Sequence, residues 1–111
     1  MDVKVSEEFL EYVLDMLSPL GKVTASRMFS GVLLKVEGAQ LGILFAETLY
    51  FKVTDATLQE EYRKNGSTQF SYTRKDKKDP IVINNWWSVP DEAMDNGKLL
   101  VSLAREVLQI S

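Results

Sequence analysis

The sequence contains neither cysteine nor histidine. The absence of cysteine excludes disulfide bonds and thiol catalysis, and it makes the reducing cytoplasm a natural setting. The absence of histidine removes the commonest general base and the commonest ligand of transition metals. Carboxylates alone could bind a hard cation, but the chain has no acidic loop with the spacing of such a site. We therefore expect no metal and no cofactor.

Long hydrophobic runs are missing as well. No apolar stretch approaches the ~18 residues of a membrane-spanning helix, and residues 1–8 are too polar for a signal peptide. We therefore expect a cytoplasmic protein that does not enter a membrane. With 111 residues, of which 45% are hydrophobic, the chain is suited to a single domain spanning residues 1–111.

Hydrophobic periodicity predicts the elements of this domain. Ser6 is a candidate N-cap for a helix whose apolar stripe runs from Phe9 to Leu17. Pro19 should restrict Ser18 to extended conformations and end the helix there. Further elements are predicted in this order: strands at 23–29, 32–36, 41–46 and 49–53, a short helix at 56–64 capped by Asp55, strands at 69–74 and 81–87, a helical turn at Pro90 and a final helix at 98–110.

This order predicts an α+β domain. Short connections between strands favour antiparallel pairing. We expect two layers, in which a mostly antiparallel sheet of about six strands packs with N-terminal and C-terminal helices. The strand at 41–46 is apolar on both faces and should be central. Gly31 should allow either a positive φ or a close approach of two backbones.

Charge is unevenly distributed along the chain. The net charge is −3, but residues 63–78 include six basic residues and one acid, a local charge of +5, which leaves −8 for the rest. The predicted strand at 69–74 carries Phe70 and Tyr72, whose rings could stack on bases. The basic residues at its end and in the turn that follows form a candidate nucleic-acid patch: Arg74, Lys75, Lys77 and Lys78. A lysine-rich turn also keeps a hairpin soluble. Because the net charge is negative, we expect at most weak, nonspecific binding to nucleic acid.

Four motifs occur in order along the chain. They are Ser26-Arg27-Met28-Phe29-Ser30-Gly31, Leu49-Tyr50-Phe51-Lys52, Phe70-Ser71-Tyr72 and Trp86-Trp87-Ser88-Val89-Pro90. Together they resemble the pattern of the N-terminal domain of the TfoX/Sxy competence-regulator family. Ser30 stands where that family usually has glycine, and Trp86 where it usually has tyrosine. The resemblance covers nearly the whole chain and implies a single-domain member.

The resemblance also implies a function. Two-domain members of that family act with the cyclic-AMP receptor protein as coactivators of DNA-uptake genes. By resemblance we expect a non-enzymatic regulatory domain that acts on competence genes through contacts with a transcription factor or the transcription machinery. A homodimer is left open. The alternative is a small ligand-binding or enzymatic α+β domain of unknown substrate.

The motifs supply the candidate interaction residues, which are Arg27, Met28, Phe29, Tyr50, Lys52, Tyr72, Trp86 and Trp87. Arg27, Tyr50 and Lys52 either form a cluster that grips a carboxylate or simply face solvent, as alternation along a strand would produce. Trp86 and Trp87 should point to opposite faces of a strand. We favour a core position for both tryptophans over an exposed binding anchor for one of them.

Arg27 carries a specific expectation. Its guanidinium should be at least partly buried and held by backbone oxygens or an acid, so that it shapes the turn that follows. Arg27→Lys would then lower the free energy of unfolding by about 1–3 kcal/mol. In the alternative, Arg27 contacts a partner and the substitution leaves stability intact.

Overall fold

The computed structural model describes residues 5–28, 31–72 and 81–110, with side chains except at Met28, Tyr72, residues 81–84 and Ile110. The elements follow in the predicted order: α1 Glu7–Leu17, a 3-10 turn η1 Ser18–Leu20, β1 Val23–Met28, β2 Gly31–Val36, β3 Ala39–Phe45, β4 Thr48–Lys52, α2 Ala56–Lys64, β5 Gln69–Tyr72, β6 Ile81–Ser88, α3 Asp91–Met94 and α4 Gly97–Ile110. The predicted α+β class is confirmed.

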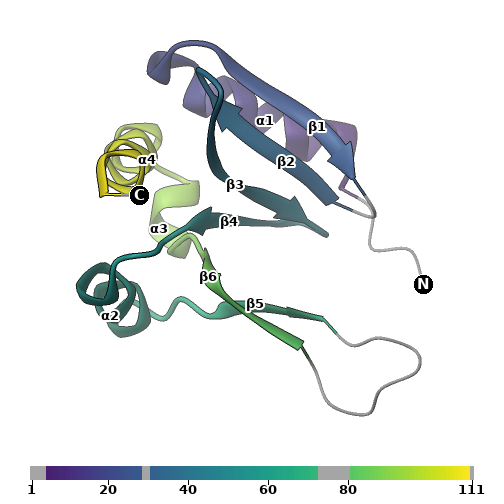
Figure 1. Ribbon diagram of the computed structural model, residues 1–111. Helices are drawn as coiled ribbons and strands as arrows, with labels where there is room; N and C mark the ends of the chain where they lie inside the picture. Colours follow the sequence, from purple (N-terminus) through teal and green to yellow (C-terminus); the bar gives the residue numbers. More distant parts are fainter. Residues whose placement is uncertain (1–4, 29–30, 73–80, 111) are drawn as a thin grey trace.

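The strands form a six-stranded sheet in the order β1-β2-β3-β4-β6-β5 (Figure 1). All neighbouring pairs are antiparallel. The apolar strand predicted at 41–46 corresponds to β3, which lies inside the sheet between β2 and β4, as expected from its two apolar faces. The edges are β1 and β5.

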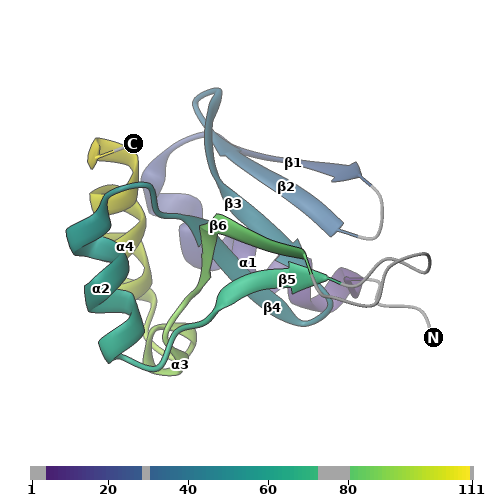
Figure 2. The ribbon, with the colours of Figure 1, turned by 60° about the horizontal axis from the view of Figure 1, so that its bottom comes forward.

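One face of the sheet carries the core. Strand partners share a face, and the pairs Val32↔Leu44, Leu44↔Leu49 and Phe51↔Trp87 place these buried side chains together. The helices bury residues in the same cluster, among them Leu17 of α1, Tyr62 of α2 and Leu100 of α4. Figure 1 shows α1 behind β1 and β2, and Figure 2 shows α2 and α4 alongside each other. None of the helices in the described ranges is long and apolar enough to cross a bilayer.

Side-chain caps fix the starts of the helices. The Ser6 hydroxyl accepts a hydrogen bond from the Phe9 amide at 3.2 Å, and the Asp55 carboxylate accepts one from the Leu58 amide at 2.9 Å. Both predicted N-caps are confirmed. Asn96 caps α4 in the same way, with 3.2 Å between its Oδ1 and the Leu99 amide nitrogen.

The predicted end of the first helix is wrong in one respect. Ser18 is helical, with φ −54° and ψ −33°, rather than extended. The chain tightens into η1, in which Pro19 lies in the first turn, where a missing amide hydrogen removes no helical hydrogen bond. The helical path therefore continues past the residue before proline and ends at Gly21, whose φ is +115°.

Gly31 fulfils one of its two predicted roles. Its φ is not among the positive glycine values of the described residues. A Cβ at this position would lie 2.8 Å from the backbone oxygen of Leu44 on the neighbouring strand. Close approach of two backbones therefore explains the glycine.

Candidate functional site

The face of the sheet opposite the core carries a second set of side chains. The described residues on this open face include Thr24, Ser26, Leu33, Lys35, Gln40, Ile43, Phe45, Thr48, Tyr50, Lys52, Phe70, Trp86 and Ser88. The described helices pack into the core cluster on the other side of the sheet. Apolar and aromatic side chains therefore remain on a face that no described helix covers.

The open face is concave. The Phe70 ring of β5 meets the Phe45 ring of β3 edge-on, with 5.0 Å between ring centroids. It meets the Tyr50 ring of β4 at 5.2 Å in the same manner. In a flat sheet, β5 and β3 would lie about 14 Å apart, because two strands separate them and adjacent strands are spaced by roughly 4.8 Å. The sheet must therefore curl toward its open face.

A shift of register between β5 and β6 accounts for the curl. Gln69 pairs with Trp87, but the next residue, Phe70, pairs with Ile83, so residues 84–86 of β6 lie between two consecutive partners. Extra residues on one strand bend it and increase its twist. The bend brings Phe70 over the open face, and Trp86 lies within the bulged segment.

Lys52, Gln40 and Lys35 form a polar border beside these aromatic rings. The Lys52 ammonium donates to the Gln40 side-chain oxygen at 3.4 Å, and Gln40 is also the strand partner of Lys35. Lys52 is in turn the strand partner of Trp86. An indole and two amines thus lie at neighbouring positions of one surface.

The charges on the strands have one sign. The six strands include no aspartate or glutamate, and their charged residues are Arg27, Lys35 and Lys52. Among the described residues, two acids lie in the turns that join strands. Glu37 accepts a hydrogen bond from the Lys22 amide at 2.8 Å, and Glu47 accepts from the Ser6 amide at 3.3 Å. Within the described residues, no carboxylate forms an ion pair with Lys35 or Lys52.

The structure divides the candidate interaction residues. Tyr50, Lys52 and Trp86 lie together on the open face. Arg27 is the strand partner of Val32, a core residue, and so lies on the helix side of the sheet. The predicted cluster of Arg27 with Tyr50 and Lys52 therefore does not form. The remaining candidates lie outside the described side chains: Met28, Phe29, Tyr72, Arg74, Lys75, Lys77 and Lys78.

The two tryptophans differ in burial. Trp87 is 3% exposed and belongs to the core, where the Arg63 guanidinium lies 5.9 Å from its ring centroid. Trp86 is only half-buried. The favoured interpretation, with both in the core, is wrong, because helices cover only one face of the sheet. Trp86 matches the alternative of an anchor at the surface.

Arg27 has the expected acidic partner, but both side chains are more exposed to solvent than the sequence predicted. Its Nη2 lies 3.0 Å from Oε1 of Glu7, and the two side chains are 52% and 78% exposed. An ion pair in such contact with water contributes little to stability, because solvent already screens both charges. The expected effect of Arg27→Lys is therefore smaller than the sequence suggested.

Burial changes the chemistry of Tyr50 on the open face. It raises the pKa of the phenol, while a hydrogen bond with the Thr48 side chain partly opposes the shift. Like an ordinary phenol, the hydroxyl is protonated at neutral pH, and it can donate a hydrogen bond to a carboxylate or carbonyl.

Phe45 and Phe70 were not predicted as members of the candidate site. One signal was present, since the strand at 41–46 is apolar on both faces and therefore needs cover on both. Alternation did place Phe45 on the face opposite Leu44. It could not show that Phe70 reaches across the sheet to meet it.

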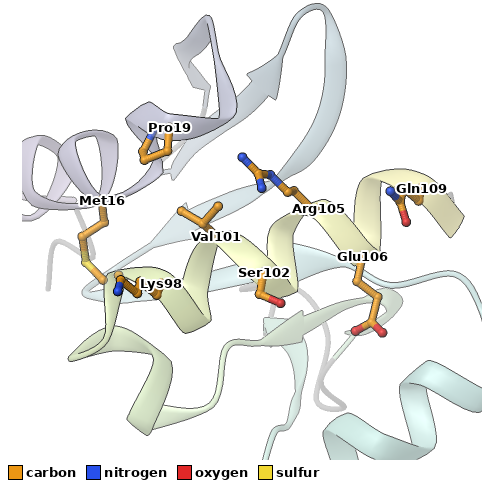
Figure 3. Close-up of a pocket in the computed structure, with 9 residues that line it drawn as sticks. Met16, Pro19, Lys98, Val101, Ser102, Arg105, Glu106 and Gln109 are labelled. Atoms are coloured by element: carbon orange, nitrogen blue, oxygen red, sulfur yellow. The ribbon is translucent and has the colours of Figure 1, made fainter.

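A groove of about 730 Å³ runs along the outer side of α4 (Figure 3). Met16 and Val101 contribute apolar surface, and Lys98 and Arg105 contribute charge. Figure 3 shows the Arg105 and Glu106 side chains pointing in opposite directions from the helix. The groove includes none of the candidate interaction residues. In the described ranges, no three acidic side chains gather where they could hold a metal ion.

The comparisons with known proteins agree with the motifs. The family model described as the TfoX N-terminal domain matches residues 15–110. No curated protein matches the chain. The matched region includes every strand and all of α2, α3 and α4. The chain belongs to the TfoX N-terminal domain family.

Proposed function

We propose that this protein is a non-enzymatic regulatory domain that binds a protein of the cytoplasmic transcription apparatus and thereby controls DNA-uptake genes. The open face carries this proposal, because it combines half-buried aromatic rings with lysines that lack an acidic partner among the described residues. Aromatic residues are enriched in the centres of protein interfaces. Membership of the TfoX N-terminal domain family supports the link to competence.

A chromosomal deletion tests this function directly. The transcripts of DNA-uptake genes should fall in the deletion strain and return when the wild-type chain is supplied. The double variant Lys52→Ala/Trp86→Ala should fail to restore them, because it removes neighbouring side chains of the open face. Transcript levels that do not change on deletion would rule out the regulatory role.

A control variant away from the open face completes this test. Lys64 is an exposed residue of α2, so Lys64→Ala removes one amine without changing the open face. It should restore the transcripts as well as the wild type does. Equal immunoblot signals for all variants would exclude a difference in protein level as the cause.

A further inference from the structure

We propose that the open face binds an extended protein segment that carries acidic residues on either side of an aromatic or aliphatic one. This inference rests on the proposed function and names the class of its partner. The binding surface consists of Lys35, Phe45, Tyr50, Lys52, Phe70 and Trp86. Its shape, its charge and its hydrogen-bonding groups each restrict what can bind there.

Shape favours a segment of chain over a flat protein surface. The Phe45, Tyr50 and Phe70 rings meet edge-on at 5.0 and 5.2 Å because the sheet curls toward this face. Phe70 fills the curl and is 8% exposed, so the groups left accessible form a row across the strands. In this row Gln40 is the strand partner of Lys35 and the hydrogen-bond partner of Lys52, and Trp86 is the strand partner of Lys52. An extended segment that crosses these strands can reach both lysines and place one apolar side chain against Trp86.

Charge requires that the segment be acidic. Lys35 and Lys52 are half-buried, and neither forms an ion pair with a carboxylate of the described residues. A neutral or basic partner would remove water from two ammonium groups without replacing it, which is strongly unfavourable. Carboxylates on the segment would satisfy both groups and also accept a hydrogen bond from Tyr50.

The same charges favour a protein segment over nucleic acid. The described strands contain no acid, and the chain has sixteen acids against thirteen basic residues, a net charge of −3. A nucleic acid extends a continuous row of phosphates past the two lysines and toward these acids, which repel it. A segment with two or three carboxylates can place its charges at the lysines alone.

A displayed library of random twelve-residue peptides tests the inference on the intact chain. Peptides selected by the wild type should contain acidic residues on both sides of an aromatic or aliphatic residue. Lys35→Glu/Lys52→Glu should select basic residues in their place. The matched control is Lys64→Glu/Lys98→Glu, which changes the same total charge at exposed positions of α2 and α4 and should keep the acidic preference.

Affinity measurements complete the test. A fluorescein-labelled peptide from the selection should bind at least about tenfold more weakly to Lys35→Gln/Lys52→Gln, since about 1.4 kcal/mol corresponds to a tenfold change. Trp86→Ala should weaken binding without changing the charge preference. Melting curves that match the wild type would show that these variants fold. If Lys35→Glu/Lys52→Glu does not fold, Lys35→Gln/Lys52→Gln replaces it in the peptide selection and should lose the acidic preference.

Several outcomes would overturn the inference. They are a selection without acidic preference, the same preference in the charge-reversed variant, tighter binding of a twelve-nucleotide oligothymidine than of any selected peptide, or self-association that Trp86→Ala abolishes. These results are distinct from a failure of the regulatory role. An acidic preference in vitro with unchanged DNA-uptake transcripts in the deletion strain would retain the binding surface and reject the proposed function.

Discussion

Tyr62 shows how one buried hydroxyl can limit stability. The residue is 2% exposed, and its hydroxyl has no hydrogen-bond partner among the described residues. An unpaired buried hydroxyl destabilises a fold by about 1–3 kcal/mol. Tyr62→Phe keeps the ring and removes the hydroxyl, so we expect the free energy of unfolding at pH 7 to rise by about 1 kcal/mol. Urea titration measures this change.

Tyr12 supplies the matched control for Tyr62. Its hydroxyl donates a hydrogen bond to the backbone oxygen of Met94. Tyr12→Phe removes a hydrogen bond that is formed, and it should lower the free energy of unfolding by about 0.5–1.5 kcal/mol. A loss of stability in Tyr62→Phe as large as in Tyr12→Phe would show that the Tyr62 hydroxyl is satisfied.

Tyr62 should also make the fold sensitive to alkaline pH. Burial, with a smaller contribution from the charge of Glu106, raises the pKa of its phenol above the ordinary value of 10.0. Above pH 10 the unfolded chain releases this proton while the folded protein retains it, so stability is complete below pH 10 and falls as the pH rises. The slope for one such group is at most about 1.4 kcal/mol per pH unit. Melting between pH 9 and about 11.5 should show a shallower decline for Tyr62→Phe than for the wild type.

Arg27 should contribute little to stability despite its place in a family motif. Its ion pair with Glu7 is half exposed, and exposed pairs contribute up to about 1 kcal/mol. Arg27→Lys preserves the charge, so we expect the free energy of unfolding to change by less than about 0.5 kcal/mol. Glu7→Gln removes the ion pair itself together with an acid of the first turn of α1, and it should lower the free energy of unfolding by up to about 1 kcal/mol. A loss above about 2 kcal/mol in Arg27→Lys would restore the structural role expected from the sequence.

At the scale of the elements, Gly42 sets the distance between β3 and β4. A Cβ on Gly42 would lie 1.9 Å from the backbone oxygen of Tyr50, and neither backbone can move without breaking strand pairing. We expect Gly42→Ala to lower the free energy of unfolding by about 3 kcal/mol or more, the upper range for overpacking. Gly97→Ala is the control, because a Cβ added at Gly97 would meet no other atom within 4 Å. This substitution should leave the free energy of unfolding unchanged or raise it by up to about 1 kcal/mol. Thermal melting of both variants measures these changes in stability. A Gly42→Ala melting curve that overlays that of the wild type would contradict the expected clash.

Local patterns predicted the elements well, because helices and strands leave their periods in the sequence. The stripe from Phe9 to Leu17 is α1, and the caps Ser6 and Asp55 lie where expected. The prediction of an extended Ser18 was wrong. A proline only disfavours the helical conformation in the residue before it, and the tighter η1 accommodates that conformation.

The open face could be predicted only in part. Alternation placed Tyr50 and Lys52 together on one side of their strand, opposite Leu49 and Phe51, and the structure agrees. In the structure both lie on that face at its half-buried margin, where Lys52 pairs with Trp86 and Tyr50 pairs with Ser88.

The rest of the open face depends on how the strands pair. What alternation could not show is that Trp86 joins Tyr50 and Lys52, because that depends on the pairing of β4 with β6. The contact of Phe70 with Phe45 depends further on the register shift between β5 and β6. Both are long-range features that no local pattern records.

At the scale of the whole molecule, the described acids are separated from the strands. The charged residues of the described strands are all basic, and every described acid lies in a helix, turn or loop. The lysines of the open face can therefore attract carboxylates locally, while the net charge of −3 weakly repels polyanions at longer range. This separation suits a domain that selects short acidic segments rather than nucleic acid.

Binding to DNA should accordingly be weak, nonspecific and sensitive to salt. The local excess of positive charge lies in residues 63–78, against −8 in the rest of the chain. We expect a dissociation constant in the micromolar range or weaker for any DNA sequence near 0.15 M salt, as is typical of nonspecific contacts with about 10⁻⁴–10⁻⁶ M affinity.

Paired substitutions locate the contacts responsible for this binding. Each lysine that meets a phosphate of duplex DNA contributes about −0.9 to the slope of log K against log salt concentration. Lys77→Gln/Lys78→Gln should therefore reduce the steepness of the slope by up to about 2, since both lysines belong to the candidate patch. Lys64→Gln/Lys98→Gln removes the same charge from α2 and α4 and should reduce it less. Fluorescence anisotropy with two unrelated duplexes, titrated at several salt concentrations, measures the slopes. Sub-micromolar binding that distinguishes the two duplexes at 0.15 M salt would contradict the prediction, because two charge-dependent contacts cannot read sequence.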